Sequence, residues 1–248
     1  MKKISGIDFE NLERKDMRSG AYSNLVPVVR SRLQLAAGPS CWREWRRAAD
    51  LAGPRAVVKF TLPGPMTMAD GMVNLHYEDE AALATDLISC IKAELAGLVE
   101  AGCRHVQIDE PVMMRWGCQE EEDGDNDDAR YPERALATGL DNLARCLEGL
   151  PDTVTKVGAA VLQGGCDCSL QAVHLCCGYP DRLDTDVFPK APKTNYNLLA
   201  PKLDSLGFDE VSIEDAEAMN DLSLLALFKN TKVVASLSTQ HSNISDHR

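Results

Sequence analysis

The chain has 248 residues, with 26 lysines and arginines against 38 aspartates and glutamates. This acidic balance argues against a surface for nucleic acid or anionic membrane, and no apolar run approaches the roughly 20 residues of a membrane span. The opening MKKISGIDFE turns charged before any apolar core, so no secretory signal is predicted and a cytoplasmic location is expected. There, the nine cysteines are expected to be thiols or metal ligands rather than disulfides.

From about residue 55 the chain alternates short apolar runs with helical patterns, which predicts an α/β fold with a parallel sheet, either a barrel or an open doubly wound sheet. Strands are predicted within 55–65, 103–111, 172–181, 208–216 and 231–238. Helices are predicted at about 78–101, 133–148, 193–206 and 217–228. The acidic run 119–128 is expected to be a solvated loop. No glycine-rich phosphate loop opens a helix, so nucleotide binding has little support.

Helix 78–101 has the clearest pattern, because its apolar residues recur at spacings of three and four on one face. They are Leu83, Leu87, Ile91, Leu95 and Leu98. Gly102 follows as a predicted C-cap, and Pro132 and Gly149 bracket the helix at 133–148. Pro201 is expected to kink or shorten the helix at 193–206.

Side chains two residues apart share a face of a strand, and the predicted strands alternate apolar and polar residues. The polar faces carry Lys59 and Thr61, Gln107 and Asp109, His174 and Cys176, and Ser212 and Glu214. These residues lie close to the carboxyl ends of their strands. The pattern suits a barrel with helices over the apolar faces and a pocket at the carboxyl ends.

His174 and Cys176 lie two apart on one face, and zinc takes imidazole and thiolate ligands. Alone, H-x-C is a weak motif, since a buried histidine beside small side chains is more often part of the core. Glu214, on the corresponding face of the next strand, adds a carboxylate and strengthens the metal interpretation. A disulfide between Cys176 and Cys177 is disfavoured because vicinal bridges are strained.

Four segments together resemble the catalytic barrel of cobalamin-independent methionine synthases, most closely their single-barrel relatives. The segments are VKFTLPGPMT, GCRHVQIDEPVM, VHLCCGYPD and VSIEDA, in the family's order and spacing. The resemblance covers about 55–235. It implies a TIM-type (β/α)8 barrel of the UROD/methionine synthase-like kind, and methyl transfer from 5-methyltetrahydrofolate to the homocysteine thiolate.

The same resemblance implies one catalytic zinc and no cobalamin, with small-molecule substrates as the partners. His174, Cys176 and Glu214 would be the zinc ligands. Asp109, with Glu110 close by, would hold the ammonium group of the substrate. Lys59 and Thr61 are expected in the walls of the pocket, although barrel strands also need filler residues.

Three departures from the family predict an incomplete barrel within a single domain over 1–248. The family's fourth zinc ligand, a cysteine on the last strand, has no counterpart before Arg248, and the first strands are missing from the poorly matched lead-in 1–54. Residues 156–171 form an insertion, for which a translated intron is one hypothesis. The competing interpretation takes Cys166 and Cys168 as replacement ligands.

Two other functions remain open from the sequence. Related barrels transfer alkyl groups to another thiol, such as coenzyme M, with similar zinc ligands. The second alternative is an inactive fragment that binds zinc weakly or only interacts with partners.

Overall fold

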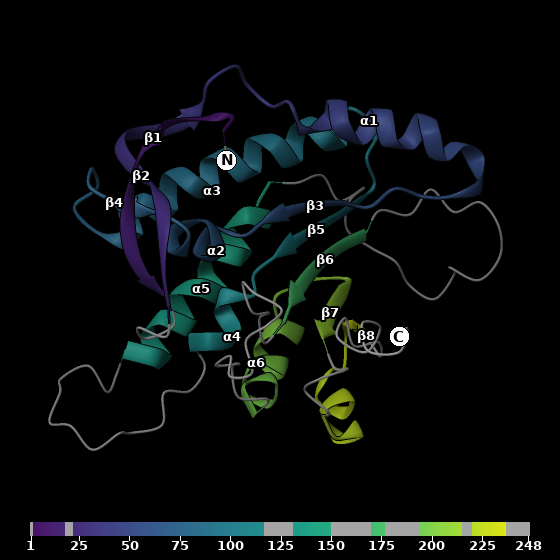
Figure 1. Cartoon of the computed structure of the whole chain (residues 1–248). Coiled ribbons are helices and arrows are strands. Elements are labelled where there is room, and N and C mark those ends of the chain that lie inside the picture. The colour runs from purple at the N-terminus through teal and green to yellow at the C-terminus, as the bar shows by residue number, and fades with distance from the viewer. Residues whose placement is uncertain are drawn as a thin grey trace, which may run out of the picture.

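The computed structural model describes residues 2–17, 22–116, 131–149, 170–176, 194–214 and 220–236. Its centre is a parallel sheet with the strand order β3-β5-β6-β7-β8 (Figure 1). The strands are β3 (Phe60–Pro63), β5 (His105–Asp109), β6 (Leu170–Leu175), β7 (Glu210–Glu214) and β8 (Lys232–Ser236). All five predicted strands are present, which confirms the α/β fold with a parallel sheet.

The parallel sheet is open in the described part of the chain, because β3 and β8 each pair with a single neighbour within it. A closed barrel is therefore not observed among these residues. The expectation of an incomplete (β/α)8 barrel agrees with the structure in its parallel strands and connecting helices.

The helices pack against this sheet and against each other (Figure 1). They are α1 (Cys41–Ala52), α2 (Pro65–Asp70), α3 (Glu80–Glu100), α4 (Val112–Trp116), α5 (Tyr131–Leu147) and α6 (Thr194–Asp204), with 3-10 turns η1 (Gly53–Arg55) and η4 (Leu222–Leu227). The predictions for α3 and α5 are confirmed to within two residues at each end. None of the described helices is long and apolar enough to cross a membrane.

Helix α6 continues through Pro201 and ends at Asp204, two residues short of the predicted end, which agrees with the expectation that the proline shortens this helix. One helix prediction needs correction. The helix predicted over 217–228 is wrong in the described residues, where only the six-residue 3-10 turn η4 forms after Asp221. The Asp221 carboxylate caps that turn by accepting a hydrogen bond of 2.8 Å from the Ser223 N–H.

Residues 4–17 and 22–35 form an antiparallel pair of strands, called the hairpin below, that the sequence did not predict. Strands β1 (Ile4–Met17) and β2 (Tyr22–Leu35) pair along their length, and β2 also pairs in parallel with the short β4 (Val73–Asn74). The pairing of β1 with β2 shifts register twice, between Ser5 and Ile7 and between Asp8 and Glu13. Irregular pairing of this kind obscures the alternation by which a strand is recognised.

Helix α3 supplies much of the core between the hairpin and the parallel sheet. Its N-cap Asp79 accepts a hydrogen bond of 2.7 Å from the Ala82 N–H, and Gly102 follows its last turn with a φ of 100°. Its five predicted apolar residues are each at most 4% exposed. Burial of each contributes about 1.5–3 kcal/mol relative to exposure.

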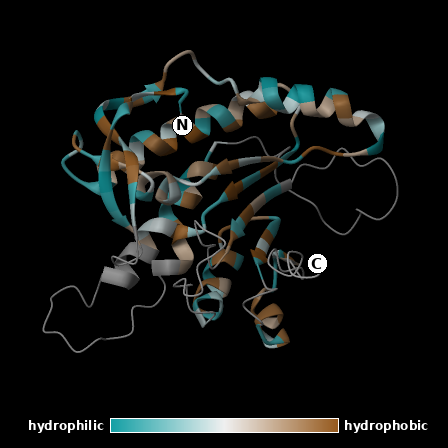
Figure 2. Ribbon diagram, in the orientation of Figure 1, coloured by the Kyte–Doolittle hydropathy of each residue, from teal (hydrophilic) through white to brown (hydrophobic). Residues whose placement is uncertain are grey.

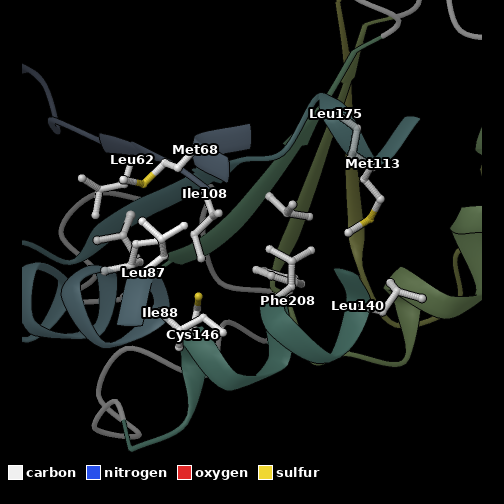
Figure 3. Packing of buried hydrophobic residues seen from close by; sticks show 14 of the residues in the cluster. Leu62, Met68, Leu87, Ile88, Ile108, Met113, Leu140, Cys146, Leu175 and Phe208 are labelled. Atoms are coloured by element: carbon white, nitrogen blue, oxygen red, sulfur yellow. The ribbon is translucent and has the colours of Figure 1, made fainter. Parts of the chain in front are cut away.

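The apolar face of the sheet meets this core. Hydrophobic residues recur along β3, β5 and β6 (Figure 2). In the packed cluster, Leu62 and Ile108 of the sheet lie near Leu87 of α3 (Figure 3). The helices therefore cover one face of the sheet, and the other face is left for polar side chains.

Candidate functional site

Strand register brings the predicted polar residues of β5, β6 and β7 onto one face. Asp109 pairs with His174, and His174 pairs with Ser212. Register partners in a parallel sheet point to the same side. Val106 and Ile108, at alternating positions on β5, belong to the hydrophobic core on the opposite face. The alternation predicted from the sequence is therefore observed in these three strands.

Asp109 ends β5 and is half-buried at the carboxyl edge of the sheet. Its carboxylate oxygen Oδ1 accepts a hydrogen bond of 2.7 Å from the side-chain nitrogen Nε2 of Gln107. Gln107 shares the polar face and is only 9% exposed. The two residues form a carboxylate held by a buried amide, directly beside the strand that carries His174.

His174 lies at the centre of the polar face. Its ring nitrogen Nδ1 is 3.1 Å from the Ser212 hydroxyl oxygen. Burial lowers the pKa of His174, although the negative charge of Asp109 opposes this shift. A neutral imidazole is therefore favoured at neutral pH. When Nδ1 carries the proton and donates a hydrogen bond to the Ser212 hydroxyl, the Nε2 lone pair can bind a metal ion.

Cys176 directly follows β6, and Glu214 is the last residue of β7. Leu175 pairs with Ile213, and Cys176 and Glu214 are the residues that follow this pair. Both are buried, at 7% and 5% exposure. The parallel register thus puts a thiol and a carboxylate at the same level of the sheet, one strand apart.

The donor types of this face fit zinc, which binds imidazole, thiolate and carboxylate. Within the described ranges, however, no three His, Cys, Asp or Glu residues lie close enough to hold a metal ion. His174, Cys176 and Glu214 therefore share a face and a neighbourhood, but they do not form an assembled metal centre in this structure. The segments 119–128 and 156–169, which include the candidate ligands Cys166 and Cys168, lie outside the described residues.

Glu110 takes a different position from its neighbour Asp109. Its side chain has no exposed surface and caps the start of α2, where it accepts hydrogen bonds from the backbone of Met66 (3.0 Å) and Thr67 (2.6 Å) and from the Thr67 hydroxyl. Burial raises the pKa of Glu110 to about 7, against the opposing effect of these hydrogen bonds. The structure therefore does not bring its carboxylate to the polar face beside His174, and its substrate role stays a prediction.

Of the two residues predicted in the pocket walls, Thr61 lies on the polar face and Lys59 lies towards the amino end of the sheet. Thr61 pairs with Gln107 and shares the polar face, where it is exposed. Lys59 precedes β3, and its Nζ lies 3.6 Å from Glu210 Oε1 at the amino end of β7. Lys232 approaches the other Glu210 oxygen at 3.1 Å. This ion-pair group is a feature that the sequence reasoning missed, although Glu210 continues the alternation of Ser212 and Glu214.

Sequence comparison identifies a family. The model of the cobalamin-independent synthase catalytic domain matches residues 9–145, which is more than half of the chain. The match begins within the hairpin, well before residue 55, where the resemblance of the sequence motifs begins. The methionine synthase of Pyrococcus furiosus is 25% identical over 180 residues, covering 72% of this chain and 39% of that protein. The methionine synthase of Saccharolobus islandicus (strain L.S.2.15) is 37% identical over 68 residues, covering 25% and 20%.

Structure comparison agrees with this result. A B12-independent methionine synthase from Shewanella sp. W3-18-1, solved in complex with selenomethionine, superposes with a TM-score of 0.69 at 23% identity, over 94% of this chain and 59% of that one. That similarity shows the fold. The chain thus spans less than two thirds of the relatives that it matches. It belongs to the cobalamin-independent methionine synthase catalytic domain family and covers part of that domain.

Proposed function

We propose that the chain is a zinc-dependent S-methyltransferase that moves a methyl group from 5-methyltetrahydrofolate to the homocysteine thiolate to form methionine. The observation that carries the proposal is the adjacency of Asp109 and His174 on the polar face of the sheet. Family membership supplies the class of reaction, and this face supplies the residue types that the reaction needs.

Asp109 is suited to the ammonium group of an amino-acid substrate. A carboxylate at the carboxyl edge of a parallel sheet neutralises that charge and orients the amino acid, so that its sulfur faces the next strand. The next strand carries His174, and Cys176 follows the last residue of that strand. The ammonium group of homocysteine would therefore bind at β5, and its sulfur would lie at β6.

His174, Cys176 and Glu214 are the residues that would hold zinc. When bound, zinc supplies a thiolate at neutral pH by lowering the pKa of the substrate thiol. Burial favours the neutral imidazole of His174, because it lowers the pKa of that side chain. This chain's own contribution is to keep the three donors on one face of the sheet, beside the Asp109 carboxylate.

Zinc content tests the first part of the proposal. Metal analysis of the purified wild-type chain should find about one zinc per chain, and His174→Ala and Cys176→Ala should each lose it. Cys41→Ser is the matched control, because Cys41 begins α1 and lies outside the polar face. Zinc retained equally by all variants, or absent from the wild type, would contradict the assigned ligands.

Turnover tests the second part. Methionine formation from 5-methyltetrahydrofolate and homocysteine should be measurable for the wild type and should fall strongly in Asp109→Asn, because the amide cannot neutralise an ammonium group. Zinc binding without methionine formation would reject these substrates. Absence of both zinc and turnover would leave the chain as an inactive part of the catalytic domain.

A further inference from the structure

We propose that Gln107 is a positioning residue that holds the Asp109 carboxylate in place to receive the substrate's ammonium group. The inference rests on the proposed function, since it takes Asp109 as the residue that binds an amino-acid thiol. It adds a residue whose effect is selectivity for thiols that carry an amino group.

The contact between the two side chains is direct. Gln107 and Asp109 lie two residues apart on β5, and Gln107 Nε2 is 2.7 Å from Asp109 Oδ1. An ionised carboxylate only accepts hydrogen bonds, so the amide nitrogen must be the end of Gln107 that faces it. This bond holds Oδ1, so Oδ2 is the carboxylate oxygen that remains to receive a substrate cation.

Packing alone does not explain a glutamine at this position. Its carbonyl oxygen Oε1 is buried and has no hydrogen-bond partner among the residues that the structure describes. A buried, half-satisfied amide is unfavourable, and an apolar side chain of similar size avoids that cost. The bond to Asp109 is therefore the feature that accounts for an amide here.

A neutral amide also suits the task. A lysine in its place would neutralise Asp109 and compete with the substrate cation, whereas a second carboxylate would repel it. Gln107 orients the carboxylate without changing its charge. On either side its register partners are the small residues Thr61 and Ala172, which contribute no competing charge.

The test compares Gln107→Met with the control Gln171→Met. Gln171 is also buried, at 1% exposure, and both of its amide atoms lack partners in the described part of the chain. It pairs with the core residue Val106, which puts it on the opposite face. The probes are homocysteine and its des-amino analogue 4-mercaptobutyrate, with binding measured by calorimetry and turnover measured in parallel.

In the wild type, homocysteine should bind more tightly than the analogue. Gln107→Met should reduce that preference roughly tenfold, which is the effect of losing one hydrogen bond to a charged group. In turnover, the variant should show a higher KM for homocysteine and an unchanged kcat. Affinity for the analogue should stay within about twofold of the wild type. The urea midpoint of unfolding should not fall, and Gln171→Met should leave the preference unchanged.

Three results would overturn the inference: an unchanged preference in Gln107→Met, equal losses for both thiols together with a lower urea midpoint, or a wild type that binds both thiols equally. The last result would also remove Asp109 from the ammonium role. A wild type that binds homocysteine selectively but makes no methionine would instead reject the proposed reaction, and the binding ratio would still decide the role of Gln107.

Discussion

Replacement of Glu110 by glutamine should change how the stability of the protein depends on pH. Glu110 is fully buried, and its pKa is raised from 4.5 to about 7, chiefly by burial. A carboxyl group whose pKa is raised in the folded state binds its proton more tightly there than in the unfolded chain. Its stabilising effect is therefore complete below about pH 4.5 and is lost as the pH rises through 7.

The size of the effect follows from the shift. A difference of about 2.5 pKa units corresponds to roughly 3.4 kcal/mol once both states are ionised. Between pH 5 and pH 8 the part lost is about 2.5 kcal/mol, because a portion has already gone at pH 5. For a urea m-value of about 2 kcal/mol/M this is a shift in midpoint of roughly 1 M.

Urea unfolding of the wild type and Glu110→Gln at pH 5, 6, 7 and 8 measures the effect as a double difference. The subtraction is needed because burial lowers the pKa values of His105 and His174. Histidines of this kind make the folded protein less stable as the pH falls. The substitution carries a constant cost, since its amide meets N–H donors at the start of α2, but this cost does not vary with pH. The reasoning is refuted if the difference between the two proteins is the same at all four pH values.

Three further substitutions test the packing by their urea midpoints. Gly64→Ala should destabilise by about 1–3 kcal/mol, because a Cβ there would lie 2.7 Å from Glu110 Cδ; a midpoint like that of the wild type would mean that the carboxylate can move. Leu95→Ala should cost about 2–5 kcal/mol, because Leu95 is fully buried in the core; a loss under 1 kcal/mol would contradict this close packing. Asp79→Ala should cost about 1 kcal/mol through loss of the N-cap on Ala82, and Asp79→Ser should restore most of it; equal loss in both would assign the effect elsewhere.

The sequence predicted those parts of the fold in which one residue period dominates. The apolar stripe of α3 repeats with the helical period over 21 residues, and the strands of the parallel sheet alternate cleanly. Irregular segments gave no such signal. The six residues of η4, LSLLAL, are almost all apolar and resemble a helical pattern, yet they form a 3-10 turn with a single buried leucine.

The candidate site shows the same difference between what regular strands predict and what irregular segments leave open. Alternation was sufficient to place Asp109 and His174 on one face, because both lie within regular strands in register. It could not show whether the ligand candidates come within bonding distance of one ion, since that depends on side-chain torsions and on residues beyond the strand ends. Glu110 carried a readable signal, because by alternation it follows Val106 and Ile108 onto the core side.

The consecutive residues Asp109 and Glu110 have different roles at the end of β5. Asp109 presents its carboxylate on the polar face, while its backbone oxygen accepts a hydrogen bond of 2.7 Å from the Gly64 N–H. Glu110 holds the first turn of α2, which begins directly after Gly64. The backbone at the end of β5 is therefore held through Gly64, Glu110 and α2, whereas Gln107 holds only the Asp109 carboxylate on the polar face. Because the two supports act on different atoms, Glu110→Gln should alter the pH dependence of stability, whereas Gln107→Met should alter substrate preference.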